Sequence, residues 1–123
     1  KKEMPYVLSA SDIATSLFIN LKEMWANSAN KFFDALAAGK PIAINYGGWQ
    51  ADMIRTTGAG LVLDPIDIDH SAKILLQAIK DKGWMEKAGL AAKRLARDEF
   101  SRDMLAQRLE AVLRSAANKN RIR

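Results

Sequence analysis

Short apolar runs alternate with helix-like segments along this chain, and this alternation limits its possible folds more than any other feature. The apolar runs, which we predict to be strands, cover residues 13–19, 41–45 and 61–63. A segment with helical spacing separates each run from the next, which indicates βαβ units with parallel strands. The sequence therefore predicts the α/β class, with a Rossmann-like parallel sheet and helices on both faces.

Helical spacing of apolar residues and the positions of capping residues predict the helices. These helices are expected over residues 4–8, 27–38, 49–57, from Asp67 or Asp69 to about Gly83, 84–100, and from Ser101 onward. In the last of them, one apolar face is expected to point inward; it comprises Leu105, Leu109, Val112 and Ala116.

Three strands are few for a parallel sheet, since most sheets have about four to six. We therefore expect an N-terminal portion of the domain to lie outside the chain. Residues 1–117 are then a partial domain and residues 118–123 a basic tail. A sheet edge exposed in this way could pair two chains.

Residue types that are scarce exclude several kinds of chemistry. With no cysteine, the chain has no thiolate nucleophile and no cysteine zinc site. His70 is the single histidine, so we expect no metal and no cofactor. The chain shows no signal peptide and no apolar run long enough to span a bilayer, and we expect a cytoplasmic protein.

The net charge of +5 is concentrated near the C-terminus. Residues 80–123 hold 12 Lys and Arg against 6 Asp and Glu, whereas residues 1–79 hold 7 against 8. A solvated helical surface is the simplest explanation of this charge. Peripheral contact with the inner face of a membrane is the next, and we expect no nucleic-acid partner because no aromatic residues interleave with the charges.

One polar stripe lies at the start of the helix predicted from residue 27. Asn27, Asn30, Lys31 and Asp34 follow the i, i+3, i+4, i+7 spacing that places residues on one face. A lysine in the first turn faces the positive end of the helix dipole, at a cost of about 0.3 to 1 kcal/mol, whereas a docked anion would make it favourable. The N–H groups of that turn also attract phosphate.

Loops that follow the three strands are expected to meet at one edge of the sheet. They cover residues 20–28, 45–49 and 64–69, and ligands of open α/β sheets bind beyond these carboxyl ends. Gly47 and Gly48 either let the backbone approach a ligand or form a plain tight turn. We expect Trp49 to pack rather than to stack on a ligand.

Three motifs of this chain occur together in a known family. They are Phe33-Asp34-Ala35-Leu36-Ala37-Ala38-Gly39-Lys40-Pro41, then Tyr46-Gly47-Gly48, then Gly58-Ala59-Gly60-Leu61-Val62. From about Pro5 to Leu113 the chain resembles the C-terminal, donor-binding half of GT-B glycosyltransferases of family 4. It looks most like the L-fucosamine transferase type of bacterial O-antigen and capsule synthesis, in which a segment like Asn-Ser-x-Asn-Lys-x-Phe-Asp recurs.

The resemblance implies an enzyme that moves a sugar from a nucleotide-sugar donor, expected to be UDP-linked, with retention of configuration and without metal. The acceptor would be a lipid-linked sugar or a polysaccharide in bacterial lipopolysaccharide synthesis. Other basic residues that the family uses would lie upstream of this chain. The fragment alone is therefore expected to be inactive.

The family's Glu-x7-Glu motif marks part of the implied site. Its second acid, which holds the donor ribose, falls on Asp34, whereas Ala26 stands in the place of the first acid. Glu23 could replace that acid only if the loop differs in length, so the catalytic residue stays open. The donor-binding residues that the resemblance and the stripe imply are Asn27, Ser28, Asn30, Lys31, Asp34, Gly47 and Gly48.

Other interpretations of the same residues stay open. Lys31 and Asp34 are also spaced for a surface ion pair. A nucleotide-sugar 2-epimerase shares the fold and donor site that the resemblance implies. A phospho-receiver signalling domain has a similar length, although Lys40-Pro41 precedes a strand here rather than following one. A non-catalytic module that binds protein or membrane through basic helices is the remaining alternative.

Overall fold

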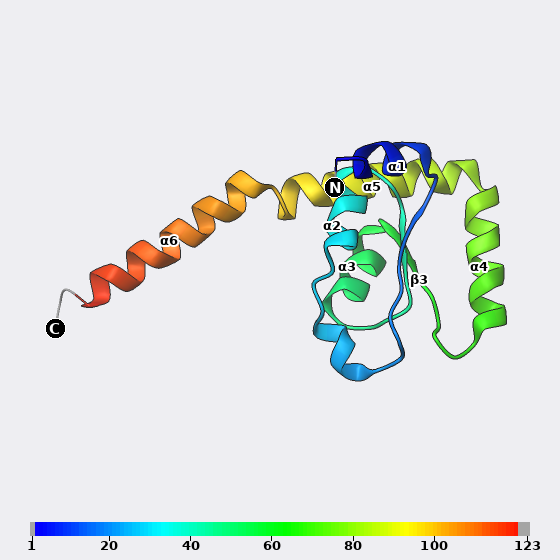
Figure 1. The fold of residues 1–123 in the computed structure, drawn as a ribbon, viewed down its shortest axis with the longest axis horizontal. Coiled ribbons are helices and arrows are strands. Elements are labelled where there is room, and N and C mark those ends of the chain that lie inside the picture. Colours follow the sequence, from blue (N-terminus) through cyan, green and yellow to red (C-terminus); the bar gives the residue numbers. More distant parts are fainter. Residues whose placement is uncertain (1, 121–123) are drawn as a thin grey trace.

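The computed structural model describes residues 2–120 (Figure 1). Its elements, in chain order, are α1 (Met4–Ala10), β1 (Ala14–Ser16), the 3-10 helix η1 (Lys22–Ala26), α2 (Asn30–Ala37), β2 (Ile42–Ile44), α3 (Trp49–Thr57), β3 (Gly60–Val62), α4 (Ile68–Lys80), α5 (Lys82–Glu99) and α6 (Arg102–Asn120). The fold is mixed α/β, as the alternation of apolar runs and helical segments predicts.

The strands form a parallel sheet in the order β1-β2-β3. Ile42 is paired with Ala14 on one side and with Gly60 on the other. A Cβ at Gly60 would overlap the Ile42 carbonyl, so only glycine allows β3 to approach β2 this closely. The strands are three residues long, and β1 is therefore much shorter than the predicted run over residues 13–19.

A hydrophobic core joins one face of the sheet to α2, α3 and α5. Ile42 and Ile44 of β2 are fully buried there. The helices contribute Phe32, Ala35, Leu36, Ala51, Ile54, Ala92 and Leu95. The last residues of α2 lead into the start of β2, and both elements share this core. The first residues of α2 therefore lie toward the carboxyl ends of the strands.

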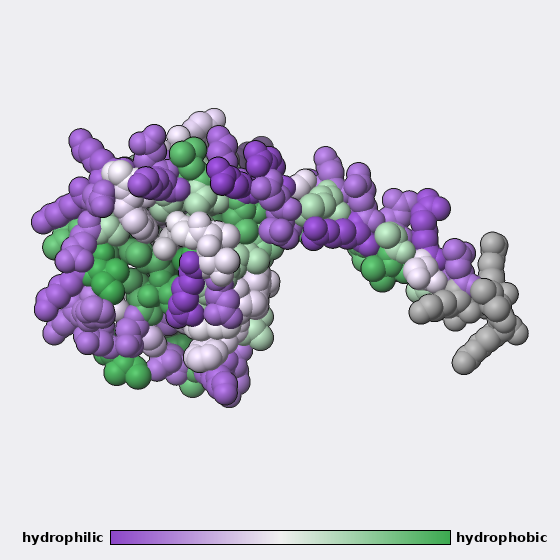
Figure 2. All heavy atoms as spheres, turned by 180° about the vertical axis from the view of Figure 1, so that it is seen from behind, coloured by the Kyte–Doolittle hydropathy of each residue, from purple (hydrophilic) through white to green (hydrophobic). Residues whose placement is uncertain are grey.

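The opposite face of the sheet is exposed at its β1 edge, whereas Ala43 at its centre is fully buried. Thr15 of β1 is exposed, and Leu17 and Ile19, which follow that strand, are 51% and 68% exposed. Seen from behind, hydrophobic residues gather in a hollow of the body (Figure 2). Within the described residues, β1 and β3 each pair with one strand and form the two edges of the sheet.

Two helix boundaries differ from the prediction. The structure starts α2 at Asn30 rather than at residue 27, because η1 precedes it and Asn27 has extended backbone angles (φ −66°, ψ 147°). α4 ends at Lys80 rather than near Gly83, because Asp81 caps the next helix and its Oδ1 accepts the Trp84 N–H at 2.9 Å. Of the two predicted caps, Asp67 and Asp69, the structure shows Asp67, whose Oδ1 accepts the His70 N–H at 2.9 Å.

The prediction that α6 turns its apolar face inward was wrong. Leu105, Leu109 and Val112 are 43%, 59% and 65% exposed, because the helix projects away from the body (Figure 1). The helix runs through residues 118–120 of the predicted basic tail, and residues 121–123 lie outside the described part of the chain.

Candidate functional site

The loops that follow the three strands meet around a cavity of about 310 Å³. Each predicted loop contributes to its lining, which consists of Asn20, Trp25, Asn45, Tyr46, Gly47, Arg55, Val62, Leu63, Asp64 and Pro65. The prediction that these loops converge is therefore confirmed. This sheet-end cavity lies where open α/β sheets bind ligands.

A side-chain amide positions the first of these loops. Asn45 donates its Nδ2–H to the Phe18 carbonyl at 2.8 Å, and its Oδ1 accepts the Phe18 N–H at 2.9 Å. The last paired residues of the two strands are Ser16 and Ile44. The amide of Asn45 thus continues the pairing beyond the end of the strands and sets the direction in which the chain leaves β1.

The two glycines of the second loop lie against Trp25. A Cβ at Gly47 would be 2.9 Å from Cε3 of the indole ring. At Gly48, where φ is +86°, a Cβ would be 2.6 Å from the Trp25 carbonyl oxygen. Packing against Trp25 accounts for both glycines, and Gly47 also lines the sheet-end cavity. Sequence reasoning did not find this role of Trp25.

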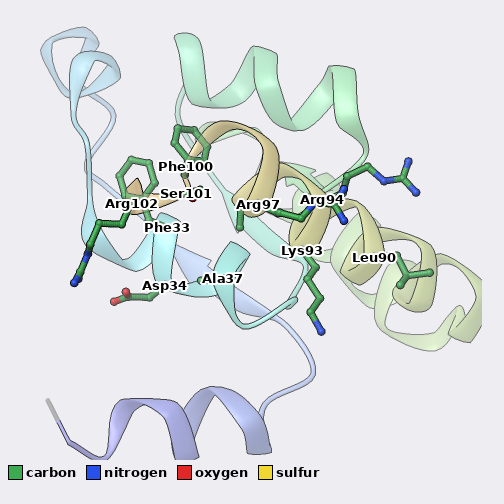
Figure 3. A pocket seen from close by; sticks show the side chains of 11 residues that line it. Phe33, Asp34, Ala37, Leu90, Lys93, Arg94, Arg97, Phe100, Ser101 and Arg102 are labelled. Carbon is green, nitrogen blue, oxygen red and sulfur yellow. The ribbon is translucent and has the colours of Figure 1, made fainter. Parts of the chain in front are cut away.

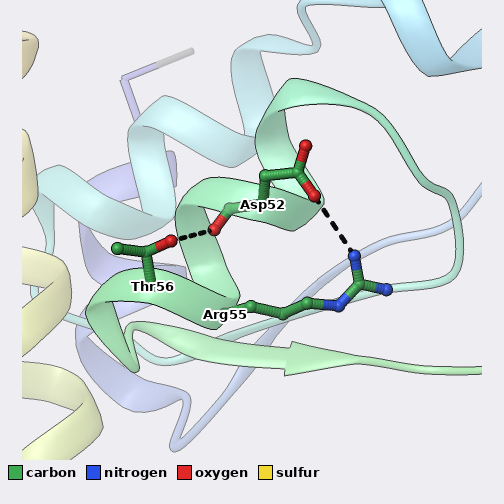
Figure 4. A network of polar contacts seen from close by, with 3 residues as sticks. All are labelled: Asp52, Arg55 and Thr56. Carbon is green, nitrogen blue, oxygen red and sulfur yellow. Dashed lines mark hydrogen bonds and ion pairs between the residues drawn. The ribbon is translucent and has the colours of Figure 1, made fainter.

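Charged groups near this cavity come from α3 and from the loop that follows β3. Arg55 of α3 pairs through Nη1 with Asp52 Oδ1 at 3.4 Å, and the Thr56 hydroxyl donates to the Asp52 carbonyl at 2.8 Å (Figure 4). Asp64 Oδ1 accepts the N–H groups of Ile66 and Asp67, and these bonds hold the pKa of Asp64 below its usual value. Arg55 was not among the residues that the sequence singled out.

The N-terminus of α2 has no side-chain cap. Its N-cap is Ala29, so Ser28 does not cap the helix. Lys31 lies in the first turn, which contains no acidic residue. The positive end of the helix dipole therefore faces a lysine, which is the arrangement that a docked anion would make favourable.

Lys31 and Asp34 do not form the surface ion pair that their spacing allows. Among residues 2–118, whose side chains the structure describes, the ion pairs are Arg55–Asp52, Arg97–Asp98, Arg108–Glu99 and Arg114–Glu110. Lys31 Nζ lies 6.0 Å from the centre of the Phe18 ring. Both Lys31 and Asp34 are exposed, so both charges are available to a ligand.

Asp34 lies where three cavities adjoin. Two of them, of about 560 and 200 Å³, are shared with α1, and Lys31 also lines the smaller one. The third, of about 780 Å³, lies among α2, α5 and the start of α6 (Figure 3). Basic side chains surround this largest cavity, namely Lys93, Arg94, Arg97 and Arg102. Asp34 and these four basic residues therefore line the same cavity, and none of the ion pairs of the described side chains joins them to Asp34.

The remaining predicted residues are spread along the approach to α2. Asn27 is half-buried at the end of η1, and Ser28 and Asn30 are exposed. Glu23 is exposed in the first turn of η1. Gly47 and Asp34 line different cavities, so the structure places the predicted residues on two neighbouring surfaces rather than around one cavity.

Four aromatic rings pack together between α2, α3 and the end of α5. They belong to Phe32, Phe33, Trp49 and Phe100. Trp49 stacks on Phe33 with ring centres 6.2 Å apart and planes 27° apart, so its ring packs against α2, and 37% of the residue stays exposed. Phe33 and Phe100 also line the largest cavity and give it an aromatic wall.

No family model, curated protein or solved structure matches this chain in comparisons with known proteins. Among residues 2–120, no three His, Cys, Asp or Glu side chains are grouped closely enough to hold a metal ion. None of the helices in this part of the chain combines the length and apolar character needed to cross a membrane.

Proposed function

We propose that this chain binds a nucleotide-sugar donor as part of a retaining GT-B glycosyltransferase. In this proposal the three-stranded sheet belongs to the Rossmann-like donor domain. The sugar passes from a donor, expected to be UDP-linked, to a lipid-linked or polysaccharide acceptor of bacterial surface polysaccharide synthesis. The resemblance of the three sequence motifs and the convergence of loops at the strand ends both support this assignment.

The N-terminus of α2 supports the proposal independently of the sequence motifs. The N-terminus of α2 has no capping side chain, and Lys31 and Asp34 near it are exposed and take part in no ion pair with the described side chains of residues 2–118. An unpaired lysine at the positive end of a helix is unfavourable without an anion. A bound phosphate would remove that cost.

The spacing of the two charges fits the order of groups in a nucleoside diphosphate. The N–H groups of the first turn and Lys31 would hold the diphosphate, with Asn27, Ser28 and Asn30 beside it. Asp34 lies three residues further, a rise of about 4.5 Å along the helix. Its carboxylate would accept hydrogen bonds from the ribose hydroxyls.

The same groups would assist transfer of the sugar. As the bond between sugar and diphosphate breaks, negative charge develops on the departing phosphate. The helix N-terminus and Lys31 would stabilise that charge electrostatically. Glu23, which is exposed in η1, is the candidate acid on the sugar side.

A titration with uridine diphosphate, followed by amide NMR signals, tests the proposal. We expect shifts at residues 27–34 and none along α4, which lies outside the proposed contacts. Uridine without phosphates should shift these signals much less, because the helix N-terminus and Lys31 recognise the diphosphate. No shift at residues 27–34 at millimolar ligand would overturn the assignment.

A further inference from the structure

α6 carries an exposed apolar stripe. Leu105, Leu109, Val112 and Leu113 are spaced i, i+4, i+7 and i+8, which places them on one face of the helix. Their exposed fractions are 43%, 59%, 65% and 59%. Such a face is costly to leave in water, and the helix projects away from the core that could have covered it (Figure 1).

Positive charge accompanies the stripe. Residues 102–123 hold six Lys and Arg against two Asp and Glu. Arg114 pairs with Glu110 at 2.7 Å, and Arg108 lies 3.9 Å from Glu99. These side chains stay 51% to 77% exposed. At about 100° per residue, Arg108 borders the apolar stripe and Arg114 lies on the opposite face of the helix, so a partner seated on the stripe would meet Arg108.

The basic surface continues from α6 onto α5. Arg102, at the start of α6, lines the same cavity as Lys93, Arg94 and Arg97 of α5 (Figure 3). All four residues are exposed. A partner lying along α6 would therefore meet further positive charge where the helix joins the body.

We propose that α6 binds an anionic lipid surface. The stripe would enter the boundary between headgroups and acyl chains, and Arg102 and Arg108, which lie on or beside the stripe, would contact the negative headgroups. A membrane of this kind supplies the apolar layer and the negative charge together, which a neutral protein groove does not. The inference does not depend on the nucleotide site, although it suits an enzyme whose acceptor is linked to lipid.

Sedimentation of the 123-residue chain with vesicles tests this inference. We expect binding to phosphatidylcholine vesicles that contain phosphatidylglycerol, and binding weaker by about tenfold or more to pure phosphatidylcholine. Leu109→Asp should abolish binding to the anionic vesicles. Leu76→Asp is the matched control, since Leu76 is a 52% exposed leucine on α4, and it should leave binding unchanged.

A variant with two charge reversals tests the contribution of the basic residues to lipid binding. Arg102→Glu with Arg108→Glu should weaken binding by at least about tenfold, since each basic residue near the surface contributes about 1 kcal/mol. Unchanged NMR signals of the core would show that the variants fold. A uridine diphosphate titration of Leu109→Asp reports on the nucleotide site separately.

Three outcomes would overturn the inference. One is the absence of binding to anionic vesicles, and another is equal binding by the wild type and Leu109→Asp. The third is a dimer that forms at high concentration without vesicles and is lost in Leu109→Asp. That result would assign the stripe to contact between two copies of the chain.

Discussion

The side chain of Asn45 pairs with the backbone of Phe18 as a neighbouring strand would, donating to its carbonyl at 2.8 Å and accepting its N–H at 2.9 Å. The pairing of β1 with β2 otherwise ends at Ser16 and Ile44. These two bonds therefore hold the chain that continues from β1 toward Trp25 and α2. They connect the core of the sheet to the candidate site.

Asn45→Ala should destabilise the protein by about 1 to 3 kcal/mol, because it leaves the N–H and carbonyl of Phe18 without their partner. Urea unfolding measures this change. Asn20→Ala is a suitable control, since Asn20 is exposed and lines the same cavity, and we expect it to stay within about 0.5 kcal/mol of wild type. Equal stability of the two variants would show that the pair with Phe18 contributes little.

Gly48→Ala should cost more stability than Gly58→Ala. Both glycines have positive φ, +86° and +72°, so alanine is strained at either position, by about 1 to 2 kcal/mol. A Cβ at Gly48 would also meet the Trp25 carbonyl oxygen at 2.6 Å, whereas nothing lies within 4 Å of one at Gly58. Thermal unfolding of both variants measures the difference, and similar losses would argue against close packing by Trp25.

Acid should remove a stabilising contribution of Asp64. The N–H groups of Ile66 and Asp67 lower the pKa of its carboxyl below the ordinary value of 3.8. Because the folded pKa is the lower one, the carboxylate stabilises the fold above pH 3.8, and this contribution is lost as the pH falls through the folded pKa. We therefore expect the difference in unfolding free energy between wild type and Asp64→Ala to shrink in acid. A difference that stays constant with pH would contradict this role.

Much of the secondary structure could be predicted because local signals determine it. Gly48 and Gly58 bound α3 at the predicted residues, Trp49–Thr57, since both adopt positive φ. Asp67 caps α4 as its position before an apolar periodic segment indicates. These features depend on neighbours in the sequence, and a pattern can reveal them.

The features that sequence reasoning missed depend on contacts between distant residues. η1 places Trp25 against Gly47 and Gly48, which lie more than twenty residues further along the chain. No local sequence pattern indicates that contact. The pairing of Asn45 with Phe18 is of the same kind. For α6, periodicity predicted which residues share a face but carries no information about what covers it.

The candidate site was predicted in part. Exposed positions for Lys31 and Asp34 follow from their polar stripe, and the structure adds that they form no ion pair with the side chains described for residues 2–118. Arg55 was missed because α3 brings it to the sheet-end cavity through the fold rather than through a motif. Asn27 lies outside α2, since the extended residues before the helix displace its start to Asn30.

The affinity of uridine diphosphate for wild type and Asp34→Ala, measured by calorimetry, tests the central claim most directly. Asp34 is exposed, so its removal should change the unfolding free energy by less than about 0.5 kcal/mol. Loss of charged hydrogen bonds to the ribose should lower affinity by about tenfold or more. Asp52→Ala, an exposed carboxylate on α3, should leave affinity unchanged. Equal affinity of wild type and Asp34→Ala, or no binding by the wild type, would contradict the account.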